Sequence, residues 1–129
     1  MGAVGNASRG IHAQVVAMVA HYLSDSGLQV TPRPYKAAQN MRLSEALAAM
    51  DDDLGGDLRG LADAFAVVSS RGDRYRLAED IARARVGADV AGKQTAIVVQ
   101  WRGGKPVSEA FAVLSLADLA RLLGGTPPP

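Results

Sequence analysis

The chain has 129 residues, 48% of them hydrophobic, which is enough to build one domain around a single packed core. It contains no cysteine, which excludes disulfide bonds, thiolate metal sites and a cysteine nucleophile. The 14 Lys and Arg nearly balance the 13 Asp and Glu, so the net charge of +1 indicates no class of partner, although eleven of the basic residues are Arg, whose planar group binds phosphate well.

The first expected element is a helix over about residues 8–26. Its apolar side chains recur at spacings of four, four and three, which places them on one face: Ile11, Val15, Val19 and Tyr22. Gly27 can supply the left-handed residue that ends this helix. Residues 28–33 then alternate as in a short strand, which Pro32 and Pro34 restrict to a sheet edge or to the strand terminus.

The middle of the chain is expected to contain one buried strand. Residues 36–50 are less decided, with a short helix over 43–50, and residues 51–56 form a solvated acidic turn. Residues 64–68 are a continuous apolar run bounded by turn residues, which is typical of a buried central strand. A hairpin partner for this strand is expected within residues 57–61.

Four elements are expected in the last part of the chain, a helix, two strands and a closing helix: residues 74–88, 95–101, 110–114 and 116–123. In the first of these helices, Glu79 and Arg83 are spaced for a favourable exposed ion pair. The glycine-rich residues 102–106 stand between two strands and predict a hairpin turn rather than a phosphate loop, which requires a strand before it and a helix after it. Ser115 can cap the closing helix.

This order of elements predicts an α/β fold, with a mixed central sheet of about four to five strands flanked by helices. We expect one domain over residues 7–124 and a flexible Pro-rich tail over 125–129. The longest apolar stretch, Val15 to Leu23, is interrupted by His21 and is far shorter than the roughly 20 residues of a membrane span. We therefore expect a cytoplasmic protein without a membrane partner.

Two kinds of metal site and a catalytic triad are not indicated. The acidic stretch beginning at Asp51 does not fit a calcium loop, because Gly55 and Ala62 occupy the positions that need oxygen ligands. His12 and His21 are nine residues apart on one helix and point to opposite sides, so they cannot share a metal ion. Neither histidine stands near an obvious nucleophile in the sequence.

The turn at residues 56–61 and the strand that follows it are the candidate site. Metal-dependent cleavage of a phosphodiester needs carboxylates that hold a divalent ion against the phosphate, and a cation that stabilises the developing charge. A turn bearing Asp, followed by a strand that delivers an acidic residue and Lys two positions apart, meets this need, because residues i and i+2 point to the same face. Asp57 and the segment Ser69-Ser70-Arg71 occupy these places here.

On these motifs the chain resembles the PD-(D/E)xK nuclease superfamily, and in particular the small Holliday-junction-resolvase-like proteins of actinobacterial phages. The matching segments are short and run from Arg9 to Leu123: the helix start Arg9-Gly10, the Gly-Asp-Leu-x-Gly turn 56–60, the helix start Leu77-Ala78 and the closing Leu-Ala-Asp-Leu-Ala-Arg-Leu-Leu helix 116–123. The resemblance implies a restriction-endonuclease-like fold and a homodimer that acts on two-fold symmetric junctions.

The chain departs from the family at the acidic residues. Asp57 stands where the metal-binding Asp of the family stands, but Gln14 replaces the glutamate of the first helix, and Ser69 and Arg71 replace the Glu and Lys of the strand. The implied catalytic set is thus Gln14, Asp57, Ser69 and Arg71. Arg71 keeps the charge but cannot act as a base, and Asp57 alone would hold Mg²⁺ or Mn²⁺ weakly. Two neighbouring carboxylates are candidates for the missing ligand: Asp63 and Asp73.

The resemblance therefore favours a nuclease-fold protein that binds branched or duplex DNA and whose metal-dependent cutting is weak or lost. Its phosphate contacts would come from eight basic residues: Arg9, Arg33, Lys36, Arg42, Arg59, Arg71, Arg74 and Arg76. One alternative is an active structure-selective endonuclease, dependent on Mg²⁺ or Mn²⁺, that uses Asp57 with an unconventional second carboxylate. The other is a non-catalytic phage structural or adaptor protein that binds a protein partner.

Overall fold

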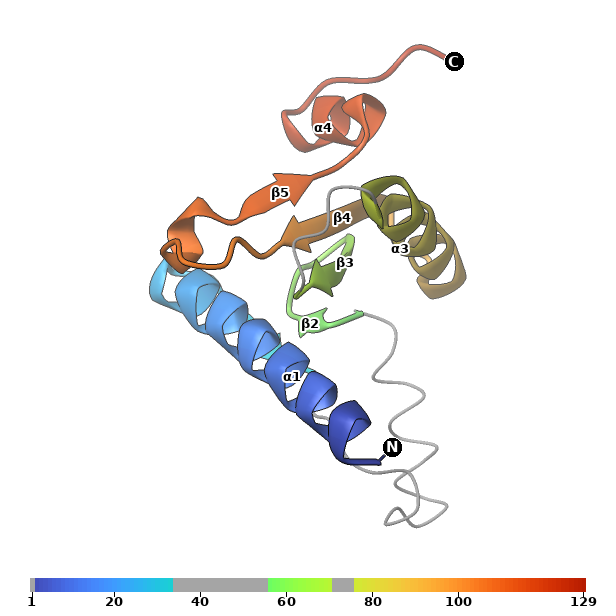
Figure 1. Ribbon diagram of the computed structural model, residues 1–129. Coiled ribbons are helices and arrows are strands. Elements are labelled where there is room, and N and C mark those ends of the chain that lie inside the picture. Colours follow the sequence, from blue (N-terminus) through green and yellow to red (C-terminus); the bar gives the residue numbers. More distant parts are fainter. Residues whose placement is uncertain (1, 34–55, 71–75) are drawn as a thin grey trace, which may run out of the picture.

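The computed structural model describes residues 2–33, 56–70 and 76–129 (Figure 1). The α/β class predicted from the sequence is confirmed. The helices and strands, in chain order, are α1 (Gly2–Asp25), β1 (Thr31–Pro32), β2 (Leu58–Arg59), β3 (Ala64–Ser69), α3 (Leu77–Ala91), β4 (Thr95–Gln100), the 3₁₀ helix η4 (Val107–Glu109), β5 (Phe111–Val113) and α4 (Leu116–Leu122). The short helix expected at 43–50 lies outside the described residues.

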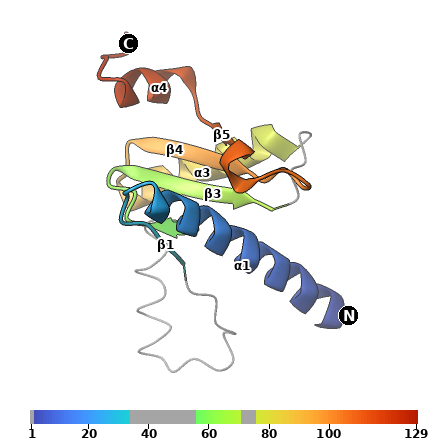
Figure 2. The same cartoon turned by 90° about the vertical axis from the view of Figure 1, so that its left-hand side faces the viewer.

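Within the described part of the chain, the main sheet has three strands in the order β3-β4-β5. Strands β3 and β4 run parallel in register from Ala64↔Thr95 to Ser69↔Gln100, and α3 connects them as a crossover. Strand β5 is antiparallel to β4, and the predicted glycine turn lies between these two strands. Figure 2 shows α1 and α3 on opposite faces of this sheet, and Figure 1 shows α4 at the side of the molecule away from α1.

The predicted central sheet of four to five strands is wrong in size. Strands β1 and β2 form a separate antiparallel pair, with Thr31 opposite Arg59, so the segment expected to form a hairpin with β3 pairs elsewhere. A single bridge between Gly56 and Ala66 joins that part of the chain to β3. Gly56 and Gly60 both have positive φ, and these turns direct the two-residue strand β2 towards β1 instead of along β3.

The core lies on both faces of β3, because successive residues of a strand point to opposite sides. Ala66 and Val68 pack with the buried residues of α1, whereas Val67 packs with Ala84 and Ala88 of α3. This two-sided burial explains why the strand appears in the sequence as a continuous apolar run.

The buried face of α1 differs in part from the face predicted. Val15 and Val19 are buried as expected, but Ile11 and Tyr22 are exposed. Val16 and Ala20 are buried in their place, so the contact face is rotated by about one residue. None of the helices in the described part of the chain has the length and apolar content that crossing a membrane requires.

Helix α3 packs closely on β3 at Gly87, and this contact leads to a stability prediction. A methyl group on Gly87 would collide with the Cε1 and Cζ atoms of the Phe65 ring. Gly→Ala within a helix ordinarily stabilises by about 1 kcal/mol. We expect Gly87→Ala to destabilise the protein instead, by about 1–2 kcal/mol, because overpacking outweighs the gain in helix propensity.

Urea unfolding measures this effect, and Gly10→Ala is the control. Gly10 lies in α1, and a methyl group there would meet no atom within 4 Å. Gly10→Ala should therefore raise the free energy of unfolding by up to about 1 kcal/mol. Equal stabilisation by the two substitutions would contradict the close packing of α3 on Phe65.

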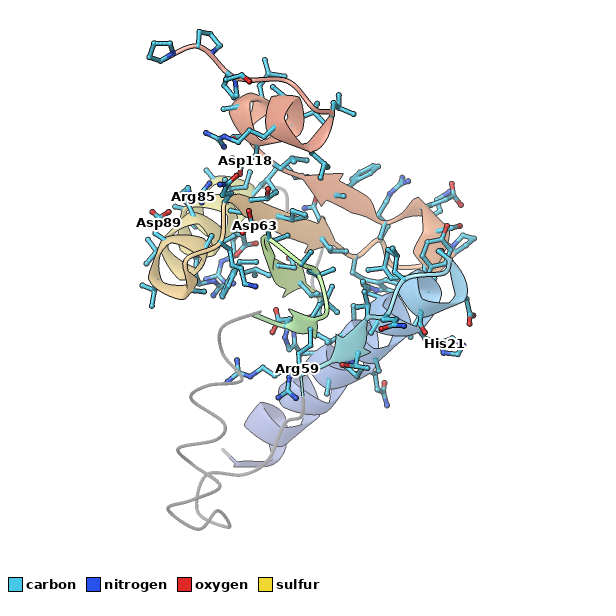
Figure 3. The ribbon with its side chains drawn as sticks, turned by 180° about the vertical axis from the view of Figure 1, so that it is seen from behind. His21, Arg59, Asp63, Arg85, Asp89 and Asp118 are labelled. Atoms are coloured by element: carbon cyan, nitrogen blue, oxygen red, sulfur yellow. The ribbon has the colours of Figure 1, made fainter. Side chains whose placement is uncertain are left out.

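Helix α4 is attached through Asp118, the most deeply buried charged residue of the described chain. Its carboxylate accepts hydrogen bonds from Arg85 at 3.1 Å, from Arg121 at 2.7 Å and from the backbone N–H of Ala96 at 3.0 Å. The predicted cap is confirmed, since the Ser115 hydroxyl accepts a hydrogen bond from the Asp118 N–H. Figure 3 shows Asp118 and Arg85 meeting between α3 and α4.

The predicted pair of Glu79 with Arg83 is wrong. Arg83 instead donates a hydrogen bond to Asp80, three residues before it, at 3.1 Å. Both spacings bring side chains together on a helix. Asp80 points to the sheet side of α3, where Arg83 can reach it beside the cleft described next.

Candidate functional site

A cleft of about 570 Å³ lies between α1, the carboxyl end of β3 and α3. Its floor is apolar and includes Phe65, Val67 and Val68. Among the described residues, eight supply its polar and charged lining: His12, Arg33, Asp57, Ser69, Ser70, Arg76, Asp80 and Arg83. The turn aspartate and the end of the buried strand, two places that the sequence analysis joined in one site, thus line the same cleft.

Asp57 is held firmly by its backbone and by its side chain. Its N–H donates to the Ala66 carbonyl at 2.9 Å, and its own carbonyl accepts from the N–H of Arg33 at 3.0 Å. Its carboxylate Oδ2 accepts from the N–H of Val68 at 2.7 Å. The turn directly before β2 therefore fixes the orientation of this carboxylate, and the charge strengthens the bond from the Val68 N–H.

His12 connects Asp57 to the end of β3. Its Nε2 lies 3.5 Å from Oδ1 of Asp57, and its Nδ1 lies 3.4 Å from the hydroxyl oxygen of Ser70. The expectation that neither histidine lies near a nucleophile is therefore wrong for His12. Ser70 follows it by 58 residues, so the local sequence could not show the contact. The available signal was helical spacing, because His12 precedes the buried Val16 by four residues and Val19 by seven.

The catalytic set that the resemblance implies is brought together only in part. Asp57 and Ser69 both line the cleft, whereas Gln14 is exposed and is not among the described residues that line it. Gln14 follows His12 by two residues, which is about 200° around the helix, so only one of the two can face the cleft. Arg71 lies outside the described residues.

The described residues contain no cluster of metal-ligating side chains. Among them, no group of three or more His, Asp or Glu side chains lies close enough together to hold one. Asp63, a candidate for the missing carboxylate, precedes β3 and accepts from the N–H of Gln94 at the opposite end of that strand. Asp73 lies outside the described residues.

Three arginines of the described chain line the cleft, and two of them, Arg33 and Arg76, belong to the predicted phosphate-binding set. Arg59 lies on β2 (Figure 3) and is not among the described residues that line the cleft. Arg9 lies within α1. The remaining members of the set are outside the described residues: Lys36, Arg42, Arg71 and Arg74.

Arg83, which was not predicted from the sequence, joins the other two arginines. Arg76, Asp80 and Arg83 stand at positions i, i+4 and i+7, which is one face of a helix, and this spacing was the signal available. The described lining of the cleft thus sets three guanidinium groups against the carboxylates of Asp57 and Asp80. This excess of positive charge favours an anionic ligand, and planar guanidinium groups suit a phosphate in particular.

Comparisons with protein-family models, with curated proteins and with solved structures found no match to this chain.

Proposed function

We propose that this chain is a nuclease-fold protein that binds DNA, and that the cleft holds the phosphodiester backbone. The observation that carries the proposal is the placement of Arg33, Arg76 and Arg83 around one cleft. One guanidinium group can bind two phosphate oxygens at once. Contacts between basic side chains and phosphates supply most of the sequence-independent affinity for DNA.

The fold supports the nuclease part of this proposal. Its elements follow one another in the order that the resemblance implies: a first helix, a short strand, a glycine-flanked Asp turn, an apolar strand, a helix, a Val-rich strand and a closing helix. Asp57 and Ser69, which stand at family positions, line the cleft together with the arginines.

Metal-dependent cutting by this cleft is proposed to be weak or lost. Of the residues that the resemblance assigns to catalysis, Asp57 is the one carboxylate, and it already accepts the Val68 N–H and lies beside His12. Because affinity for a hard cation follows the number of charged oxygen ligands, we assign no step of the function to Mg²⁺ or Mn²⁺.

The test is the salt dependence of DNA binding, measured by fluorescence anisotropy with a labelled duplex and a labelled four-way junction in EDTA. If the arginines neutralise about three phosphates, the logarithm of the affinity should fall with a slope of about −2.7 against the logarithm of the salt concentration. The affinity should therefore drop about 40-fold between 50 and 200 mM salt. We expect Arg76→Gln to weaken binding and to reduce the slope by about 0.9.

Arg102→Gln is the matched control. Arg102 is a half-buried arginine whose guanidinium carbon lies 4.4 Å from the centroid of the Phe111 ring, and it is not among the described residues of the cleft. It should leave both affinity and slope unchanged. Binding that does not respond to salt, or an equal loss in the two variants, would remove the support for a DNA-binding cleft.

A further inference from the structure

We propose that Asp57, His12 and Ser70 form a relay that cleaves phosphodiesters without a metal ion, with Ser70 as the nucleophile and His12 as the base. The substrate class rests on the proposed function, because the arginines of the same cleft would hold the phosphate. The chemistry is a separate claim, since it rests on the contacts among the three residues.

The direction of the hydrogen bonds among the three side chains suits general-base catalysis. An ionised carboxylate can only accept hydrogen bonds, so the imidazole of neutral His12 places its proton on Nε2, which lies 3.5 Å from Asp57. Nδ1 then carries a lone pair towards the Ser70 hydroxyl at 3.4 Å. Ser70 is thus the donor and His12 the acceptor, which is the arrangement that activates a serine. Contacts of this length are usual in unliganded sites and shorten when substrate binds.

The relay is anchored on three elements that the core holds in place. His12 lies on α1 one turn before the buried Val16, and Ser70 follows directly after β3. Asp57 is fixed by the Val68 N–H, so its carboxylate acts as a positioning group that orients the imidazole. The side chains of His12 and Asp57 are only 29% and 15% exposed, and this partial shielding from water strengthens their interaction.

The proposed reaction needs no reactant other than water and the phosphodiester. As Oγ of Ser70 attacks the phosphorus, its proton passes to Nδ1 of His12 and the bond to one ester oxygen breaks. The protonated imidazole returns that proton to the leaving alkoxide, and one DNA strand stays linked to Ser70. Water, deprotonated by His12, then attacks the phosphorus, the bond from the phosphorus to Oγ breaks, and His12 returns the proton to Oγ of Ser70. Arg33, Arg76 and Arg83 line the same cleft and would stabilise the negative charge that develops.

The first experiment incubates the full chain with end-labelled duplex and four-way junction DNA in EDTA, followed by an SDS quench. We expect cleaved DNA and a labelled strand that migrates with the protein. Ser70→Ala and His12→Gln should each lower the cleavage rate by about 100-fold or more, because the first removes the nucleophile and the second removes the base. His12→Gln keeps a polar side chain of similar size, which protects the test against simple unfolding.

Two substitutions serve as controls. His21 is on the same helix and lies 3.3 Å from Asp25, but this pair is exposed to solvent and remote from Ser70. Ser108 is an exposed serine of η4. His21→Ala and Ser108→Ala should leave the cleavage rate within about twofold, because neither side chain lines the cleft.

The outcomes separate this inference from the proposed function. Salt-sensitive DNA binding without cleavage or a covalent adduct in EDTA would overturn the relay and retain the DNA-binding cleft. Cleavage that needs Mn²⁺ and persists in Ser70→Ala would also overturn it. If DNA does not bind, hydrolysis of bis(p-nitrophenyl) phosphate in EDTA decides: a rate that Ser70→Ala abolishes supports the relay, and no hydrolysis overturns it.

Discussion

Replacing Asp118 by Ala is expected to lower the free energy of unfolding by about 3 kcal/mol. The side chain is almost wholly buried and accepts hydrogen bonds from Arg85, from Arg121 and from the Ala96 N–H. Its removal leaves the buried Ala96 N–H without that acceptor and releases α4 from β4. Because the two arginines are partly exposed, they regain water, and this keeps the loss near the lower end of the range for a broken buried pair.

Asp89→Ala separates burial from ion pairing in the same cluster. Asp89, which is labelled in Figure 3, also pairs with Arg85, at 3.2 Å, but its side chain is 68% exposed. Its loss should change stability by no more than about 0.5 kcal/mol. Urea unfolding followed by the fluorescence of Trp101, the only tryptophan, measures both variants. A similar loss in the two would mean that burial of the Asp118 carboxylate contributes little.

Gly56→Ala is expected to lower the free energy of unfolding by about 3 kcal/mol and also to weaken DNA binding. Gly56 is buried with φ +74°, a conformation that costs an alanine about 1–2 kcal/mol. The added methyl group would also collide with the Ala66 carbonyl oxygen. That oxygen accepts the hydrogen bond of the Asp57 N–H, so the shift would move the carboxylate that lines the cleft.

Gly92→Ala provides the control for backbone strain alone. Gly92 ends α3 with φ +71°, and a methyl group there would meet no atom within 4 Å. This variant should lose only the conformational contribution of about 1–2 kcal/mol and should bind DNA as the parent does. Equal losses of stability and affinity in the two variants would show that the Gly56 turn does not position the cleft.

The sequence by itself determined the elements whose signals are local. The apolar run of β3, the left-handed glycine after α1 and the Ser115 cap of α4 each depend on neighbouring residues, and all three are found in the structure. The predicted boundaries of the helices and strands were less accurate. Helix α3 begins at Leu77 rather than Arg74, and η4 precedes β5 without having been predicted, because a 3₁₀ turn of three residues has almost no periodicity to detect.

Pairing between distant segments was decided only by the tertiary structure. β2 pairs with β1 across a gap of more than twenty residues, and two-residue strands offer no pattern from which that register could be predicted. His12 meets Ser70, and Gln14 does not line the cleft beside Asp57, because the packing of α1 on β3 selects which side of the helix faces the cleft. Periodicity defines the faces of an element, but burial against its neighbours decides where each face points.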